Sequence, residues 1–232
     1  MRESLPRELS VAIESGGRTT AVVYAAAGQA TRPSALILAH GAGAGQRHPF
    51  MVAFARALSA RGIDVVTFNF RYMEQKRRVP DRMPQLVVCY RAVMAAARDE
   101  VPSALEHLFI GGKSMGGRAA THVAAEDSSL PISGIVLLGY PLHPPGRPEQ
   151  TRDAHLPAVN RPMLFVQGSR DTFGTPSELK PILGSLDPLP TLHSVHDGDH
   201  SFTMAGRGAK DKQAAVYGEV AATIVEWIGS VP

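Results

Sequence analysis

The stretch HLFIGGKSMGGR, residues 107–118, constrains the fold more than any other part of this 232-residue chain. Its first four residues have the apolar character of a buried strand, and a helix-forming run begins at Arg118. A turn that passes from strand to helix in so few residues forces its central residue, Ser114, into a strained backbone conformation. Small residues must flank it, because Cβ atoms at Gly112 and Gly116 would collide across the turn. We therefore expect the Ser114 hydroxyl at the carboxyl edge of a sheet, beside a helix N-terminus, where a nucleophile would stand.

Two other structures are compatible with a glycine-rich stretch of this kind. The first is an ordinary strand-to-helix turn in which Ser114 only caps the helix. The second is a phosphate-binding P-loop, because Gly112, Lys113 and Ser114 resemble its final residues. A P-loop also requires a glycine five residues before Gly112, where this chain has His107. The P-loop is therefore excluded, and the choice between helix cap and nucleophile depends on the rest of the chain.

Segments with strand and helix character alternate along the chain. Strands are predicted at 10–14, 19–24, 35–39, 64–70, 107–111, 132–138, 163–167 and 191–195. Helices are predicted at 50–58, 85–98, from 118 onward, 177–186 and 211–228, the last with an apolar face formed by Val216, Val220, Ile224, Trp227 and Ile228. This order predicts an α/β fold with a mostly parallel sheet, helices on both faces and an antiparallel hairpin at one edge. No repeat or clear break divides the chain, so we expect one domain, 1–232.

Composition argues against several classes of function. The net charge of +3 is too small to indicate nucleic-acid binding. No apolar stretch approaches the roughly 20 residues of a membrane span, and residues 1–8 lack the apolar segment of a secretory signal. The single cysteine, Cys89, excludes an internal disulfide and fits a reducing compartment. We therefore expect a cytoplasmic protein that makes no contact with a membrane.

The loop GAGAG, residues 41–45, follows the predicted strand 35–39. In parallel sheets, function gathers on the loops after the carboxyl ends of the strands. Small residues leave backbone amides free, so the N–H groups of Ala42 and Met115 are predicted to form an oxyanion hole. A dinucleotide site is the alternative, but the spacing Gly-x-Gly-x-Gly lacks one residue, and the next strand does not end in a carboxylate that could bind a ribose.

Two later loops supply candidate partners for Ser114. Asp171 follows the strand 163–167, where a carboxylate can orient a histidine, although a lone Asp in a turn is more often only a turn former. His200 follows the last strand and is predicted to act as the general base. His196 is the weaker candidate, because we expect it to lie still on the strand. The chain order Ser114, Asp171, His200 is the one expected for this topology, and this agreement favours a nucleophile over a helix cap.

The chain resembles α/β-hydrolases over nearly its whole length. The matching segments are HGAG at 40–43, FNFRY at 68–72, GGKSMG at 111–116, GYPLHPPG at 139–146 and QGSRD at 167–171. More narrowly, it is similar to small dienelactone-hydrolase-like hydrolases, the group that includes testis-expressed protein 30. The resemblance implies the fold and a Ser-His-Asp triad but no substrate. Dienelactone hydrolase itself uses a cysteine nucleophile where this chain has Ser114, so its lactone substrate is not implied.

The predicted function is hydrolysis of a small-molecule carboxylic ester, thioester or related acyl group. Ser114 attacks, His200 moves the proton, Asp171 orients His200, and an acyl-enzyme is then hydrolysed by water. An amidase or peptidase would use the same residues. The alternative from another class is a non-catalytic protein-binding module, because the similar proteins include a chromatin-complex subunit regarded as a scaffold.

Two further loops bear on the substrate. Residues 71–82 contain five Lys or Arg and are predicted either to be a solvated surface or to clamp a substrate carboxylate or phosphate through Arg71, Tyr72, Arg77 and Arg78. Residues 143–162 occupy the place where larger hydrolases insert a helical cap. They are too few for a folded cap, so we expect an open site that His143 and His155 contact. No second ligand at zinc-site spacing accompanies these histidines, and neither a metal nor another cofactor is expected.

Overall fold

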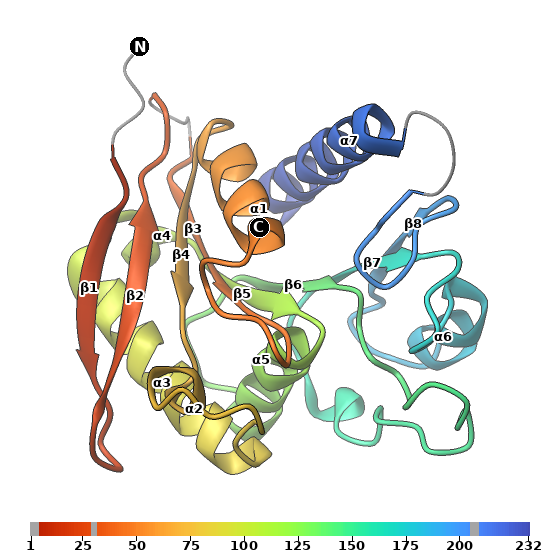
Figure 1. The fold of residues 1–232 in the computed structure, drawn as a ribbon, viewed down its shortest axis with the longest axis horizontal. Helices are drawn as coiled ribbons and strands as arrows, with labels where there is room; N and C mark the ends of the chain where they lie inside the picture. Colours follow the sequence, from red (N-terminus) through yellow and green to blue (C-terminus); the bar gives the residue numbers. More distant parts are fainter. Residues whose placement is uncertain (1–4, 29–31, 205–208) are drawn as a thin grey trace.

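One eight-stranded sheet organises the computed structural model, which describes residues 5–28, 32–204 and 209–232. The strand order is β1-β2-β4-β3-β5-β6-β7-β8, in which β1 and β2 are antiparallel and β3 to β8 run parallel (Figure 1). The strands are β1 Arg7–Ala12, β2 Arg18–Tyr24, β3 Ser34–Ala39, β4 Ile63–Phe68, β5 Leu108–Lys113, β6 Gly134–Leu138, β7 Met163–Gly168 and β8 Thr191–Val195. The prediction of a mostly parallel sheet with an antiparallel hairpin at one edge is confirmed.

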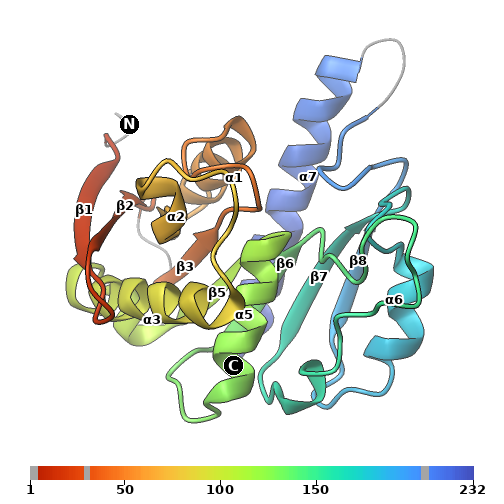
Figure 2. The ribbon, with the colours of Figure 1, turned by 60° about the horizontal axis from the view of Figure 1, so that its bottom comes forward.

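Helices cover both faces of this sheet (Figures 1 and 2). They are α1 Pro49–Ser59, α2 Arg71–Glu74, α3 Met83–Glu100, α4 Ser103–Glu106, α5 Met115–Glu126, α6 Pro176–Leu183 and α7 Ala209–Ser230, with a 3-10 turn, η1, at Leu156–Ala158. Helices α1 and α7 pack on one face, whereas α3, α5 and α6 pack on the other. All residues of β3, β5, β6 and β7 are buried, as expected of central parallel strands covered on both sides.

Local signals explain where several helices begin. Proline stands in the first turn of α1, α3 and α6, where its missing N–H costs no hydrogen bond. Thr175 and Glu178 form a reciprocal capping box at the start of α6. In α7, the predicted apolar face is confirmed by Val220, Ile224 and Ile228, which are buried in the core against α1.

The helices α2 and α4 and the turn η1 were not predicted, because each is only three or four residues long. Helix α5 starts at Met115, three residues earlier than expected. Its first turn contains Gly116 and Gly117, whose low intrinsic helix propensity hides the true beginning of the helix. Residues 143–162 form a loop with one 3-10 turn and no separate cap domain.

None of the helices in the described ranges is both long and apolar enough to cross a membrane. The prediction that residues 1–8 lack the apolar segment of a secretory signal rests partly on residues 1–4, which lie outside the described residues.

Candidate active site

Ser114 occupies a sharp turn between β5 and α5. Its backbone has φ 52° and ψ −117°, a left-handed conformation that is strained for a residue with a side chain. A Cβ at Gly112 would lie 2.7 Å from the carbonyl carbon of Gly116, and one at Gly116 would lie 2.4 Å from the carbonyl oxygen of Ala39. The turn is therefore possible only with glycine at both positions, and it holds the Ser114 side chain at the carboxyl edge of the sheet.

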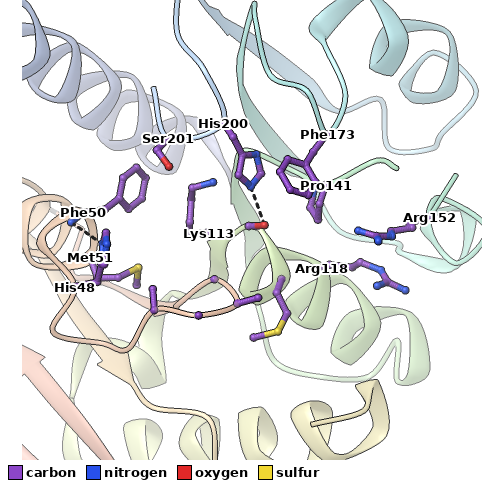
Figure 3. A pocket seen from close by; sticks show the side chains of 16 residues that line it. His48, Phe50, Met51, Lys113, Arg118, Pro141, Arg152, Phe173, His200 and Ser201 are labelled. Carbon is purple, nitrogen blue, oxygen red and sulfur yellow. Dashed lines mark hydrogen bonds between the residues drawn. The ribbon is translucent and has the colours of Figure 1, made fainter. Parts of the chain in front are cut away.

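His200 and Asp171 complete a hydrogen-bonded chain that starts at Ser114. The distance from Ser114 Oγ to His200 Nε2 is 2.9 Å, and that from His200 Nδ1 to Asp171 Oδ2 is 2.7 Å. The ionised carboxylate can only accept, so Nδ1 carries the hydrogen and Nε2 is left to accept from the serine hydroxyl. The three side chains come from the loops after β5, β7 and β8, whose carboxyl ends meet at one edge of the sheet. Figure 3 shows His200 above the pocket, with its hydrogen bond to the serine as a dashed line.

The Asp171 carboxylate is fully buried and held by two further donors. Nε2 of Gln167 donates to Oδ2 at 2.8 Å, and the N–H of Phe173 donates to Oδ1 at 2.8 Å. The ring of Phe173 also lies against the imidazole of His200, with centroids 4.3 Å apart. Asp199 shapes the histidine loop, because its Oδ1 accepts from the N–H groups of Ser201 and Thr203. Sequence reasoning assigned no role to Gln167, although it stands in the QGSRD segment.

Ala42 and Met115 line the same pocket as Ser114, and their backbone N–H groups have no acceptor in the described part of the chain. His40 fixes the loop that carries Ala42, since its Nδ1–H donates to the carbonyl of Gly41 at 2.8 Å and its Nε2 accepts from the N–H of Phe70 at 3.0 Å. Burial lowers the pKa of His40 from 6.5 to about 4, although the Gly41 hydrogen bond opposes this shift. The imidazole is therefore neutral at pH 7. Sequence reasoning quoted the HGAG segment but assigned no role to its histidine.

A pocket of about 530 Å³ opens around Ser114, a size suited to a small molecule. Its walls are largely apolar, with Phe50 and Met51 on one side and Pro141 and Phe173 beside His200 (Figure 3). The glycine-rich loop after β3 forms another part of the lining.

Lys113, the last residue of β5, also lines this pocket. Its side chain is buried, and its Nζ has no hydrogen-bond partner among the described residues. Burial lowers the pKa of Lys113 from 10.5 to about 7, while the charges of Asp171 and Asp199 oppose the shift. A Cβ at Gly139 would lie 2.9 Å from Nζ of Lys113 and 3.3 Å from Nδ1 of His200, so a side chain at Gly139 has no space.

Comparison with known proteins agrees with this arrangement. Residues 32–229 match the family described as the alpha/beta hydrolase domain. The chain belongs to the α/β-hydrolase family. Membership supports a hydrolytic activity, whereas the narrower group around testis-expressed protein 30 stays a prediction.

Solved structures of other hydrolases share the fold over nearly their whole length. XC6422 from Xanthomonas campestris, described as a serine hydrolase without a lid, is 23% identical, with a TM-score of 0.74 and coverage of 98% of this chain and 97% of that one. A dienelactone hydrolase from Anabaena variabilis is 19% identical, with a TM-score of 0.75 and 99% of both chains covered. An esterase domain of a Rhodothermus marinus protein is 15% identical, with a TM-score of 0.67 and coverage of 95% and 98%. At these identities the likeness establishes the fold of this hydrolase.

The basic segment 71–82 does not line the pocket of this hydrolase. Tyr72 is fully buried, Arg77 pairs with Asp81 four residues later, and Arg71 lines a separate, smaller cavity. Arg78 is exposed and lies outside the pocket lining. Its first residues form helix α2, and Arg77 and Asp81 pair within the segment. None of these four residues lines the pocket, so the geometry favours the solvated surface, and the anion clamp stays a prediction.

The three other candidate histidines also lie outside the pocket lining. His143 is buried and hydrogen-bonds to Glu178 at 3.1 Å. His155 stacks on His122, with ring centroids 3.7 Å apart, and contacts the hydroxyl of Thr121. The side chain of His196 is 90% exposed and lies against Asp197. These contacts hold the loops together and leave His200 as the histidine beside Ser114.

Proposed function

We propose that this chain is a serine hydrolase that cleaves a carboxylic ester, thioester or related acyl substrate through an acyl-enzyme. The observation that carries the proposal is the Ser114–His200–Asp171 chain of hydrogen bonds, with a strained serine at the edge of a pocket. A serine that only caps a helix would need neither partner, and its side chain makes no capping hydrogen bond to α5. The bonded pair of partners therefore favours catalysis over the cap.

In the proposed reaction, Ser114 Oγ attacks the acyl carbon while Nε2 of His200 takes the hydroxyl proton. The negative charge that forms on the acyl oxygen accepts hydrogen bonds from the N–H groups of Ala42 and Met115, and one such donor contributes about 3–4 kcal/mol in studied hydrolases. His200 then protonates the leaving oxygen or sulfur, and the alcohol or thiol departs. Water, deprotonated by His200, cleaves the acyl-enzyme and releases the acid.

Asp171 keeps His200 in the tautomer that this reaction needs and stabilises the imidazolium that forms. Gln167 and the N–H of Phe173 hold the carboxylate in place, so Asp171 cannot turn away from the histidine. The esterase domain and the dienelactone hydrolase among the similar structures support an ester over an amide. Amides would use the same residues and differ in the leaving group.

The first test is labelling with a fluorophosphonate probe followed by intact-mass measurement. Attack by Ser114 Oγ displaces fluoride, so wild type gains the mass of one phosphonyl group. Ser114→Ala should gain none. Ser201→Ala is the matched control, because Ser201 lines the same pocket but its hydroxyl is not bonded to His200, and this variant should still label.

The second readout is hydrolysis of a neutral aryl ester. Ser114→Ala should lower kcat by several orders of magnitude, up to about 10⁶-fold as in other serine hydrolases. A folded wild type that neither labels nor hydrolyses esters contradicts the proposal. The non-catalytic binding module would then be the better account, and partner isolation would replace enzyme assays.

A further inference from the structure

Two arginines, Arg118 and Arg152, line the pocket on the side opposite His48 and Phe50 (Figure 3). Arg118 comes from the first turn of α5, and Arg152 comes from the loop between β6 and β7. Neither guanidinium forms an ion pair with a described residue of the chain, and neither donates a hydrogen bond to one. Both fixed positive charges are therefore free to interact with a bound molecule.

When no anion is bound, this arrangement of two arginines lowers the stability of the folded protein. Arg118 is partly buried, and its Nε is fully buried with no acceptor in the part of the chain that the structure describes. Leaving such a donor unsatisfied costs about 1–3 kcal/mol. Burial lowers the pKa of Arg118, nearby Tyr140 opposes this shift, and the charge of Arg152 lowers the pKa further, so the two cations are close enough to repel each other.

Arg91 is a partly buried arginine with a structural role, and it offers a comparison with the two arginines of the pocket. It lies on α3, and both Glu126 and Asp127 approach its guanidinium to within 4 Å. Within the described ranges, no carboxylate pairs with Arg118 or Arg152 at the pocket. A bound anion would supply the missing acceptors, because a guanidinium presents parallel N–H groups that match two oxygens of one carboxylate or phosphate.

We propose that Arg118 and Arg152 form a subsite for an oxyanion, a carboxylate or a phosphate, at the far end of the acyl substrate. The inference rests on the proposed hydrolase function, and it makes the preferred substrate an ester that carries a second, charged group. The apolar wall formed by Phe50 and Met51 lies across the pocket from the two arginines and suits the uncharged part of the molecule.

The kinetic test compares three esters of equal chain length: p-nitrophenyl valerate, the mono-p-nitrophenyl ester of glutaric acid, and its phosphonate-terminated analogue. Wild type should favour one or both anionic esters. Arg118→Ala and Arg152→Ala should each lower the ratio of kcat/KM for the anionic esters to that for valerate by about 10- to 100-fold, as expected for a charge-assisted pair. The better anionic ester identifies the oxyanion.

Arg147→Ala is the matched control. Arg147 lies on the same loop as Arg152 and carries the same charge, but it is exposed and outside the pocket lining. Its removal should leave the ratio of anionic to neutral kcat/KM unchanged. Arg118→Lys should recover only part of the preference, because an ammonium group cannot pair with two oxygens at once. Equal ratios in wild type, Arg118→Ala and Arg152→Ala would overturn the proposal.

A binding measurement separates this proposal from the proposed function. Glutarate and inorganic phosphate are titrated by NMR into Ser114→Ala, with and without Arg118→Ala or Arg152→Ala. Binding that needs both arginines supports the subsite even if no ester is hydrolysed. Ester hydrolysis that needs Ser114, with no glutarate or phosphate binding and no anionic preference, would refute the subsite and leave the hydrolase intact.

Discussion

His40 should make the stability of this hydrolase depend on pH between about 4 and 6.5. In the folded protein its pKa is lowered to about 4, whereas the unfolded chain has the ordinary value of 6.5. Between these values the unfolded state binds more protons, so the free energy of unfolding falls as the pH falls. The stability that the neutral, buried His40 contributes is complete above pH 6.5 and is lost as the pH falls through 4. At 1.36 kcal/mol per pKa unit, the shift from 6.5 to about 4 amounts to about 3 kcal/mol.

The structural reason is the pair of hydrogen bonds that His40 makes. Protonation of Nε2 would turn an acceptor into a donor that faces the N–H of Phe70. The variant His40→Gln tests this, because its amide can still donate and accept but does not titrate. Urea unfolding of both proteins at pH 4, 5, 6 and 7 should show that wild type loses about 3 kcal/mol more than the variant. Other titrating groups, such as His155, are common to both proteins and cancel in this comparison. If the free energies of unfolding of wild type and His40→Gln changed in parallel from pH 4 to 7, the reasoning would be refuted.

Three more substitutions test the architecture of the site. Gly116→Ala should destabilise the fold by about 3 kcal/mol or more in urea unfolding, because its Cβ would lie 2.4 Å from the backbone oxygen of Ala39. The control Gly229→Ala, on an exposed part of α7 with nothing within 4 Å, should be neutral or stabilising by up to about 1 kcal/mol. Lys113→Met should abolish the rise in stability that wild type shows from pH 7 to 10.5, at most about 5 kcal/mol, because the folded lysine is neutral where the unfolded one is still charged. Asp171→Asn should lower kcat for a neutral ester by about 10⁴-fold with little change in KM, since the amide favours the wrong imidazole tautomer.

The alternation of strands and helices could be predicted because each signal is local. Apolar runs such as 35–39 indicate which segments form strands of the sheet, and the turn around Ser114 indicates where one of these strands ends. The topology then brings the loops after β5, β7 and β8 together, which is why Ser114, Asp171 and His200 lie within hydrogen-bonding distance in the structure. Their order along the chain was enough to select them, without any knowledge of side-chain packing.

The charged residues of the pocket could not be predicted in the same way. Five cations in residues 71–82 form the densest basic segment, but the density of charge says nothing about which way a segment faces. One local sign was present, because Arg77 and Asp81 stand four residues apart and pair in the structure. His143 and His155 likewise found partners within the protein that no spacing in the sequence indicates.

The electrostatic character of the site follows from which charged side chains have a partner within the protein and which do not. The Asp171 carboxylate is surrounded by donors, which stabilise its charge within the hydrogen-bonded chain. Lys113 is neutral in part at pH 7, because burial holds its pKa at about 7. Arg118 and Arg152 are the arginines of the lining, neither has an ion-pair partner among the described residues, and both lie on the side of the pocket opposite His48 and Phe50. A substrate with a single negative charge would therefore enter in one orientation, with its anion at the arginines and its acyl carbon beside the serine.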